Sequence, residues 1–284
     1  MLTNIRELVK SDAFSGVLLM FSFLLALIIS NTSLNDEYNS LIYLPISLNL
    51  GTHSFKTNFI KLVNDGLMTF FFLLLSLEMK YHLIKGEYSD HKKLLLPSVT
   101  AIGGVVGPAA IFMMFNYGTQ EAKGWAIPIA TDTAFVLGIV SFFARSISLS
   151  LKIFILGFSL IDDAFAILIL AIFYSDSLTS ISVVFSFLIT AIMFFLNYYG
   201  IKNLNAYITL GIFLWVALLD AGIHPTLAGV ILAFAIPLDL QKDSNHELVA
   251  FERKIRNIVA YAILPIFAFI NSEIQFSDVA LDLS

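Results

Sequence analysis

Long apolar stretches, most of them near the length of a membrane-spanning helix, alternate with short polar segments along the chain. A helix needs about 20 mainly apolar residues to cross the hydrocarbon core of a bilayer. On that criterion the pattern predicts about nine spans: residues 13–31, 59–79, 94–116, 124–144, 153–174, 178–199, 204–219, 222–237 and 255–270. We therefore expect an all-α polytopic membrane protein, with a single membrane domain over residues 1–284.

The segment 44–58 departs from this helical pattern. Ile46, Leu48 and Leu50 alternate with other residues ahead of Gly51, which is the period of a β-strand followed by a turn. This pattern predicts an outer β-hairpin over residues 44–58, with an irregular loop as the alternative. Because an isolated hairpin is barely stable in water, we expect it to pair with something else.

Composition agrees with a membrane location. The 284 residues are 58% hydrophobic and 13% charged, whereas about a quarter of the residues in a soluble domain are charged. The net charge of -5 is scattered, which gives no nucleic-acid-binding surface. The sequence has no cysteine and no phosphate-binding, dinucleotide or zinc motif. Primary pumping by ATP is therefore unsupported.

The lysines and arginines predict the orientation, because cytoplasmic loops of membrane proteins are enriched in them. With a cytoplasmic N-terminus, only three of the 16 basic residues fall on the outer side, namely Lys56, Lys61 and Lys123. The C-terminus would then lie outside. This pattern predicts a multi-pass membrane protein with a cytoplasmic N-terminus.

Two adjacent acids, Asp162 and Asp163, lie near the centre of the predicted span 153–174. An ionised aspartate there costs at least about 2.5–3.5 kcal/mol, so acids inside the membrane are functional by default. Burial and mutual repulsion favour the neutral form, so such a pair can hold either a proton or a small hard cation. The alternative is a pair neutralised by a basic residue of a neighbouring helix.

A second group of polar residues lies at the middle of the predicted span 124–144. Pro128 precedes Thr131 and Asp132, and proline removes a helical hydrogen bond. Discontinuous helices at mid-membrane are a recurring device in transporters. We predict one around Thr131–Asp132, with an ordinary proline kink as the alternative. Asp65 and Glu78 lie near the ends of the span 59–79, where an ion path and interfacial solvation explain them equally well.

These residues resemble the NhaA family of sodium/proton antiporters over nearly the whole chain. The matching motifs include Asn-Asp-Gly-Leu-Met at 64–68, Leu-Glu-Met-Lys at 77–80, Gly-Trp-Ala-Ile-Pro-Ile-Ala-Thr-Asp-Thr-Ala-Phe at 124–135, Ile-Asp-Asp at 161–163 and His-Pro-Thr-Leu-Ala-Gly-Val at 224–230. The resemblance implies exchange of Na+ or Li+ for protons, serving pH and sodium homeostasis. It also implies a secondary transporter of the bacterial inner membrane that is not an enzyme and needs no cofactor.

The resemblance also implies roles for individual residues. Asp163 would be the main Na+ ligand and Asp162 its titrating partner, with Thr131 and Asp132 in the unwound crossing beside them. Glu78 and Glu252 match the family's pH-sensing cluster, and Asp65 is a further ion-path candidate. Family members dimerise through a hairpin placed like residues 44–58. Tyr81, His82, Arg253 and Arg256 depart from the commonest pattern in that cluster.

The resemblance further implies a length of twelve helices, built partly from two inverted three-helix repeats. From this we expect an incomplete inverted-repeat antiporter fold without the last three helices. We also expect the 284-residue chain alone not to exchange ions at a measurable rate. Two alternatives to antiport stay open: a non-transporting remnant or subunit of a split antiporter, and a passive cation channel.

Overall fold

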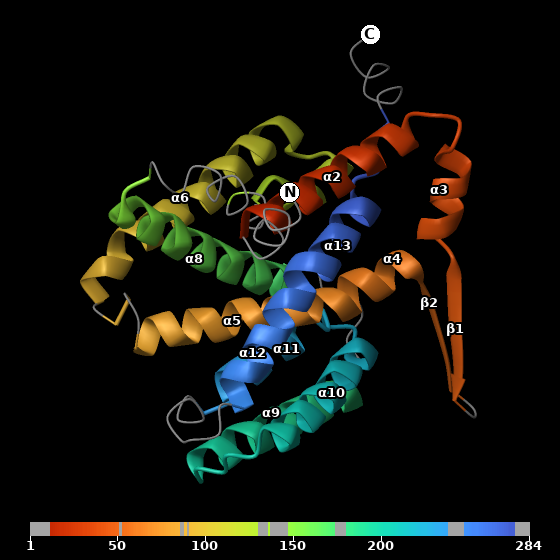
Figure 1. The fold of residues 1–284 in the computed structure, drawn as a ribbon. Helices are drawn as coiled ribbons and strands as arrows, with labels where there is room; N and C mark the ends of the chain where they lie inside the picture. The colour runs from red at the N-terminus through yellow and green to blue at the C-terminus, as the bar shows by residue number, and fades with distance from the viewer. Residues whose placement is uncertain are drawn as a thin grey trace, which may run out of the picture.

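Helices make up most of the structure, a computed structural model that describes residues 12–50, 53–85, 88–89, 91–129, 136, 147–173, 180–237 and 247–275 (Figure 1). The α-helices are α2 (Asp12–Ser30), α3 (Asn35–Ile42), α4 (Phe59–Lys61), α5 (Met68–Ile84), α6 (His91–Asn116), α8 (Leu149–Phe173), α9 (Ser180–Tyr198), α10 (Leu204–Ala221), α11 (Leu227–Ala235), α12 (Glu247–Ile258) and α13 (Leu264–Asn271). Two π-helical segments, η1 (Leu62–Leu67) and η5 (Val259–Ile263), join α4 to α5 and α12 to α13.

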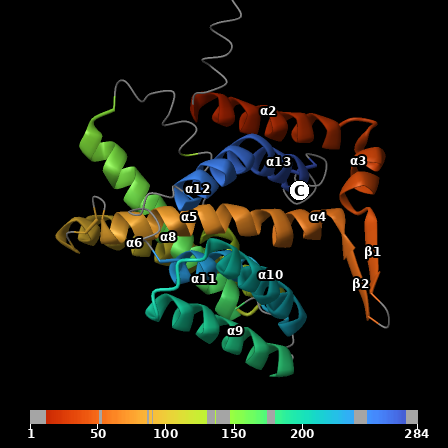
Figure 2. The same ribbon diagram turned by 60° about the horizontal axis from the view of Figure 1, so that its bottom comes forward.

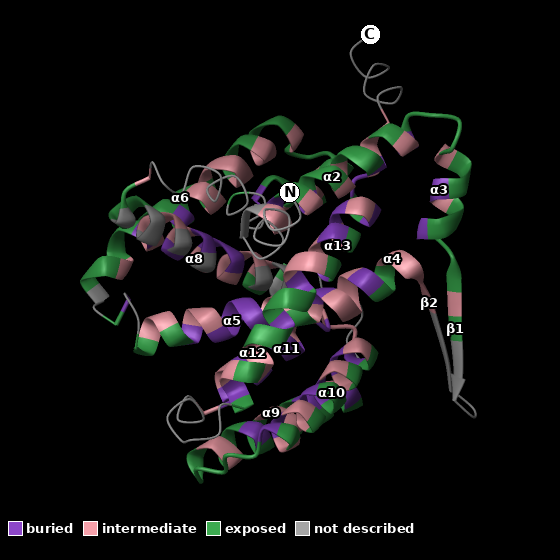
Figure 3. Ribbon diagram, in the orientation of Figure 1, coloured by how far each residue is buried: buried purple, intermediate pink, exposed green. Residues whose placement is uncertain are grey.

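The described helices have the length and the surface of a membrane protein. Five continuous helical stretches are long and apolar enough to cross a bilayer: Phe59–Ile84, Lys92–Asn116, Ile181–Tyr198, Leu204–Ala221 and Glu247–Asn271. Large apolar side chains lie on the outside, such as Phe115 on α6 and Phe187 on α9, which are 83% and 72% exposed. Figure 3 shows exposed residues along both helices. A bilayer is the solvent that such surfaces require.

Apart from α3, which lies between the first two predicted spans, the described helices overlap predicted spans, and two of them differ clearly in their bounds. The number of nine spans stays a prediction. α11 is only nine residues long, because the preceding helix ends at Gly222, whose φ of 74° lies in the left-handed region, and Pro225 follows. α12 begins at Glu247, ahead of the predicted start at Ile255. Its first turns are amphipathic, with Leu248 buried beside charged positions, so they do not read as a continuous apolar stretch.

Most of the predicted span 124–144 lies outside the described residues. Its described part contains two short 3-10 helices, η2 (Gln120–Gly124) and η3 (Ile127–Ile129). The predicted break around Thr131–Asp132 is not among the described residues, and it stays a prediction.

The predicted hairpin is confirmed. Strands β1 (Pro45–Leu50) and β2 (His53–Asn58) pair antiparallel, with Pro45 opposite Asn58 and Leu50 opposite His53. The side chain of Asn58 then caps the next helix by accepting a hydrogen bond from the backbone N–H of Lys61 at 3.0 Å. The hairpin therefore continues directly into α4, and it extends away from the helices (Figure 1).

Two hydrophobic clusters hold the helices together. The larger one joins α5, α9, α10, α11 and α12 and includes the fully buried Tyr207 and Leu214. The smaller one packs Ala26 of α2 and Ile270 of α13 with residues of α3 and η1. In Figure 2, α5 crosses the middle of the molecule, with α2 and α13 on one side and α9 and α10 on the other. α6 and α8 pack together at one end of α5.

Candidate ion-binding site

The acid pair is buried inside α8. Asp162 is 2% exposed and Asp163 is 6% exposed, although α8 is otherwise almost wholly apolar. Successive helical positions point about 100° apart, so the two carboxylates face different directions from one level of the helix. The structure therefore places both predicted acids in the interior, where a charged carboxylate needs a proton, a cation or a polar partner.

Ser159 is a third polar residue beside this pair. It is 3% exposed and lies three positions before Asp162 and four before Asp163, which places its hydroxyl on the same side of α8. Ser159 was not among the residues predicted for the site. The i, i+3, i+4 spacing was visible in the sequence, but a lone serine in a membrane helix is common enough to be passed over.

Small residues let α6 approach the acid pair closely. A methyl group added at Gly104 of α6 would lie 3.9 Å from Oδ1 of Asp162 and 3.8 Å from the ring of Phe158. On another side of α8, an apolar cavity of about 240 Å³ separates it from α5 and α11, with Ala164 and Ser76 in its lining. The carboxylate of Asp162 thus meets α6, whereas α8 faces α5 and α11 across apolar space.

Among the described residues, two carboxylates and one hydroxyl at this point of α8 offer oxygen atoms that could coordinate a cation. No group of three or more His, Asp or Glu side chains with metal-binding spacing occurs among the described residues. Oxygen donors of this kind suit a hard cation such as Na+. Thr131 and Asp132, the other two residues predicted for this site, lie outside the described residues.

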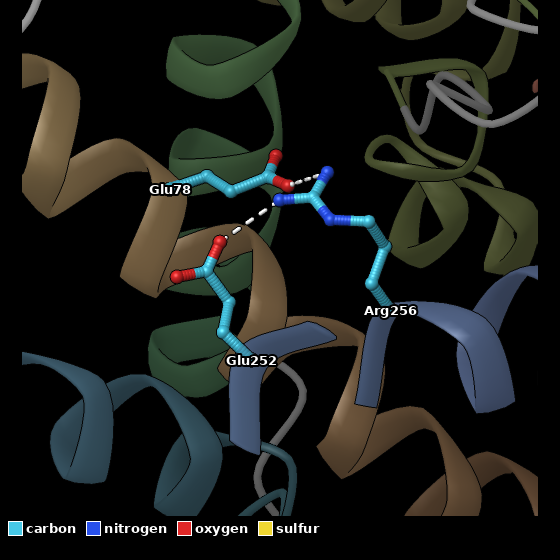
Figure 4. A network of polar contacts seen from close by, with 3 residues as sticks. All are labelled: Glu78, Glu252 and Arg256. Carbon is cyan, nitrogen blue, oxygen red and sulfur yellow. Dashed lines mark hydrogen bonds and ion pairs between the residues drawn. The ribbon is translucent and has the colours of Figure 1, made fainter. Parts of the chain in front are cut away.

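A second polar cluster brings together two of the residues predicted for pH sensing. Arg256 of α12 lies 2.6 Å from Oε1 of Glu78 on α5 and 2.9 Å from Oε1 of Glu252, one turn earlier on α12 (Figure 4). The glutamates are about a fifth exposed and the arginine is half exposed. One guanidinium thus bridges two carboxylates across the contact between α5 and α12.

Arg256 is the residue of this cluster that sequence reasoning undervalued. In the sequence, Arg256 stands out only as a departure from the family's commonest pattern in the pH-sensing cluster. Its planar guanidinium can serve two carboxylates at once, which a single lysine does less well. The resemblance placed Glu78 and Glu252 in one cluster, but no sequence signal showed that Arg256 would bridge them.

Asp65 lies apart from both clusters. It belongs to the π-helical segment η1, about 20 Å along the same helix from Glu78 at 1.5 Å per residue. Its backbone carbonyl accepts hydrogen bonds of 2.7 Å from Trp215 and from Thr69. The structure therefore separates Asp65 from Glu78 and Glu252, with which it was grouped.

Comparison with known proteins decides the family. The sequence model described as Na+/H+ antiporter 1 matches residues 6–283. The chain belongs to this antiporter family. It is 52% identical over 273 residues to the Na(+)/H(+) antiporter NhaA of Rickettsia massiliae, covering 95% of this chain and 67% of that protein. It is 40% identical over 283 residues to the NhaA of Sulfurovum sp., covering 98% of this chain and 72% of that protein.

Membership of the Na+/H+ antiporter 1 family agrees with the long apolar helices of the structure. A relative named NhaA in Vibrio vulnificus is 39% identical over 278 residues, which are 98% of this chain and 69% of that protein. Together with the long apolar helices, these matches identify a multi-pass bacterial membrane protein. The family consists of transporters rather than enzymes.

Proposed function

We propose that Na+/H+ exchange by this family member takes place at the carboxylates of Asp163 and Asp162. The expectation that residues 1–284 alone do not exchange ions stays a prediction. The antiport activity follows from membership of the Na+/H+ antiporter 1 family and from the NhaA relatives. The observation that carries the site is the burial of two adjacent carboxylates, 2% and 6% exposed, within an apolar helix. Neither a passive channel nor a non-transporting remnant is favoured by these matches.

The exchange follows from competition at one place. A buried carboxylate gains a neutralising partner from either a proton or a cation, and binding of one disfavours binding of the other. In this scheme Asp163 is the main ligand of Na+ or Li+ and Asp162 is its titrating partner. Thr131 and Asp132 complete the site from the neighbouring segment. Alternating access would then present the site to each side of the membrane in turn, with no cofactor taking part.

The bridge between Glu78, Arg256 and Glu252 is the proposed second part of the mechanism. All three side chains are partly exposed, so water and ions can reach them. We assign Glu78 and Glu252 to the response to pH and to the path of the ion, with Arg256 holding them together. Asp65, at the far end of the same helix, would belong to the path on the opposite side of the membrane.

The proposal places the protein in the bacterial inner membrane with its N-terminus in the cytoplasm. The placement of lysine and arginine supports that orientation. The hairpin of β1 and β2 would lie outside and join two copies of the chain. Its strands have no further strand partner among the described residues, which leaves edges able to pair with a second copy.

Measurement of sodium-driven proton movement in liposomes tests the site, with the chain extended to the length of its NhaA relatives, as for every exchange measurement below. Asp163→Asn keeps the shape of the side chain but removes its negative charge, so we expect exchange to fall to the level of empty liposomes. The matched control is Asp220→Asn, which alters a carboxylate that accepts a hydrogen bond from Ser182 between α9 and α10. Exchange at the wild-type rate by the Asp163 variant would exclude this residue as the ion ligand.

A further inference from the structure

A lysine is buried within the long helix that carries Glu78. Lys80 of α5 is 7% exposed. Its ammonium donates hydrogen bonds of 2.6 Å to the carbonyl oxygens of Phe234 and Ile236, and a longer one of 3.4 Å to that of Ala233. A buried cation is costly unless its hydrogen bonds are made. Here its partners are backbone carbonyls rather than a carboxylate.

These carbonyls are the ones that the end of α11 leaves without helical partners. A helix leaves its last four carbonyls unpaired, and they carry its partial negative charge. α11 ends at Ala235, and Ile236 is already extended. The remaining carbonyl in this stretch, that of Ala235, accepts a hydrogen bond of 2.6 Å from the side chain of Asn197 on α9. Side chains from two other helices therefore complete the end of α11.

Lys80 links this helix end to the Glu78 bridge. Residues two positions apart in a helix point about 200° apart, so Lys80 and Glu78 leave α5 on nearly opposite sides. One side chain contacts the end of α11, and the other pairs with Arg256 of α12. α12 is the next helix after α11 in the chain. All three helices also share one buried hydrophobic cluster, so the position of α11 against α5 constrains where α12 can pack.

We propose that Lys80 is a positioning residue for ion exchange. By holding the end of α11 against α5, its ammonium sets the place of Arg256 and Glu252 opposite Glu78. A second close contact supports the same alignment, since Gly229 of α11 packs against the backbone of α5 at Thr69 and Leu73. This inference rests on the function proposed above for the Glu78, Arg256 and Glu252 bridge, and it adds Lys80 as the residue that aligns that bridge.

The experiment compares the Na+ dependence of exchange in liposomes for Lys80→Met, Lys80→Arg and Asn197→Leu. We expect Lys80→Met to raise the apparent KM for Na+ several-fold. Lys80→Arg, which keeps the charge and the donors, should restore it to within about twofold. Asn197→Leu removes the other side-chain partner of the same helix end without touching α5. It should lower the melting temperature in detergent and leave the apparent KM unchanged.

A double-variant cycle distinguishes positioning from a merely structural role, because residues that act through one another do not have additive effects. Lys80→Met combined with Arg256→Gln should be no worse in apparent KM than Arg256→Gln alone. If the two effects multiply, or if Lys80→Met leaves KM unchanged, the proposal is wrong. If Lys80→Met fails to fold, Lys80→Gln, which keeps a neutral hydrogen-bond donor, replaces it in the same comparison of apparent KM values. Unchanged exchange by both Arg256→Gln and Asp163→Asn would instead overturn the proposed function itself.

Discussion

At the scale of single residues, the hydroxyl of Ser159 is the described neighbour best placed to assist the acid pair. It is buried on the same side of α8 as Asp162 and Asp163. A neutral oxygen donor can contribute to binding of Na+ without adding to the repulsion between the carboxylates. Loss of the Ser159 hydroxyl should therefore weaken the binding of Na+ more than the binding of a proton.

We therefore predict that Ser159→Ala raises the apparent KM for Na+ by up to about tenfold, the equivalent of about 1.4 kcal/mol. The maximal rate should change little. Sodium-driven proton movement in liposomes gives both values. Ser186→Ala is the matched control, since it removes another buried serine hydroxyl, on α9, that donates a hydrogen bond to the carbonyl of Ser182. Equal KM values for the two variants would remove Ser159 from the site.

Tyr38 gives a prediction about pH at the same scale. It lies in α3, and its hydroxyl donates a hydrogen bond of 2.5 Å to the carbonyl of Phe269 in α13. Burial, with smaller contributions from the charges of Glu273 and Tyr43, raises the pKa of Tyr38 to about 12. Because the folded pKa lies above the unfolded value of 10, the unfolded state loses its proton first. Stability from this residue is complete below pH 10 and is lost as the pH rises from 10 to 12.

The test is the thermal unfolding of Tyr38→Phe in detergent, a variant that keeps the ring and removes the hydroxyl. At pH 8 the wild type should be more stable by about 1 kcal/mol, the usual net contribution of one hydrogen bond. That difference should shrink between pH 10 and 12, because only the wild type carries the titrating group. A difference that stays constant over this interval would contradict the raised pKa.

At the scale of the elements, α5 and α11 cross so closely that only glycine fits. A Cβ atom at Gly229 would lie 2.4 Å from the carbonyl oxygen of Thr69 and 3.0 Å from the backbone nitrogen of Leu73. Both are backbone atoms, so the helices themselves would have to move apart. Forced overpacking of this kind costs about 1–3 kcal/mol.

We predict that Gly229→Ala lowers the melting temperature in detergent by several degrees. Gly103→Ala is the control, because a Cβ added at Gly103 on α6 meets nothing within 4 Å. Alanine has the higher helix propensity, so this control should be neutral or slightly stabilising. Equal melting temperatures for the two variants would show that the crossing of α5 and α11 is looser than described.

The elements also show what the sequence could and could not predict. Hydrophobic periodicity located the described long helices, and the alternation of Ile46, Leu48 and Leu50 located the hairpin, because both are local patterns. The π-helical segments η1 and η5 carry no such signal. They coincide with contacts between distant parts of the chain, such as the reciprocal amide hydrogen bonds of Asn64 and Asn271 at 2.9 and 3.0 Å.

The same distinction applies to the proposed site. Asp162 and Asp163 were predictable, because an acid is conspicuous in an apolar helix. The bridge at Arg256 and the ammonium of Lys80 were not, because each depends on where a second helix lies. Pairing of residues from distant segments is the part that one sequence leaves open.

At the scale of the whole molecule, the hairpin is the feature that points away from the single chain. β1 and β2 form a sheet of only two strands, and two strands are marginally stable on their own. The hairpin extends from the helical part of the molecule beyond α3 and α4 (Figure 2). A second copy presenting the same strands could pair with an open edge, as closed two-fold dimers do.

Deletion of residues 51–55 should therefore weaken dimerisation and leave the chemistry of exchange intact. The deletion removes the two residues between the strands and the first three residues of β2, so the register that pairs Leu48 with Phe55 and Leu50 with His53 is lost. Native mass spectrometry in detergent gives the dimer fraction, and sodium-driven proton movement in liposomes gives the exchange rate. Asp163→Asn is the reciprocal control, expected to dimerise fully and to exchange nothing. Equal dimer fractions for the deletion and the wild type would show that the two copies meet elsewhere. Loss of exchange in a deletion variant that still dimerises would show instead that the hairpin supports the helices of its own chain.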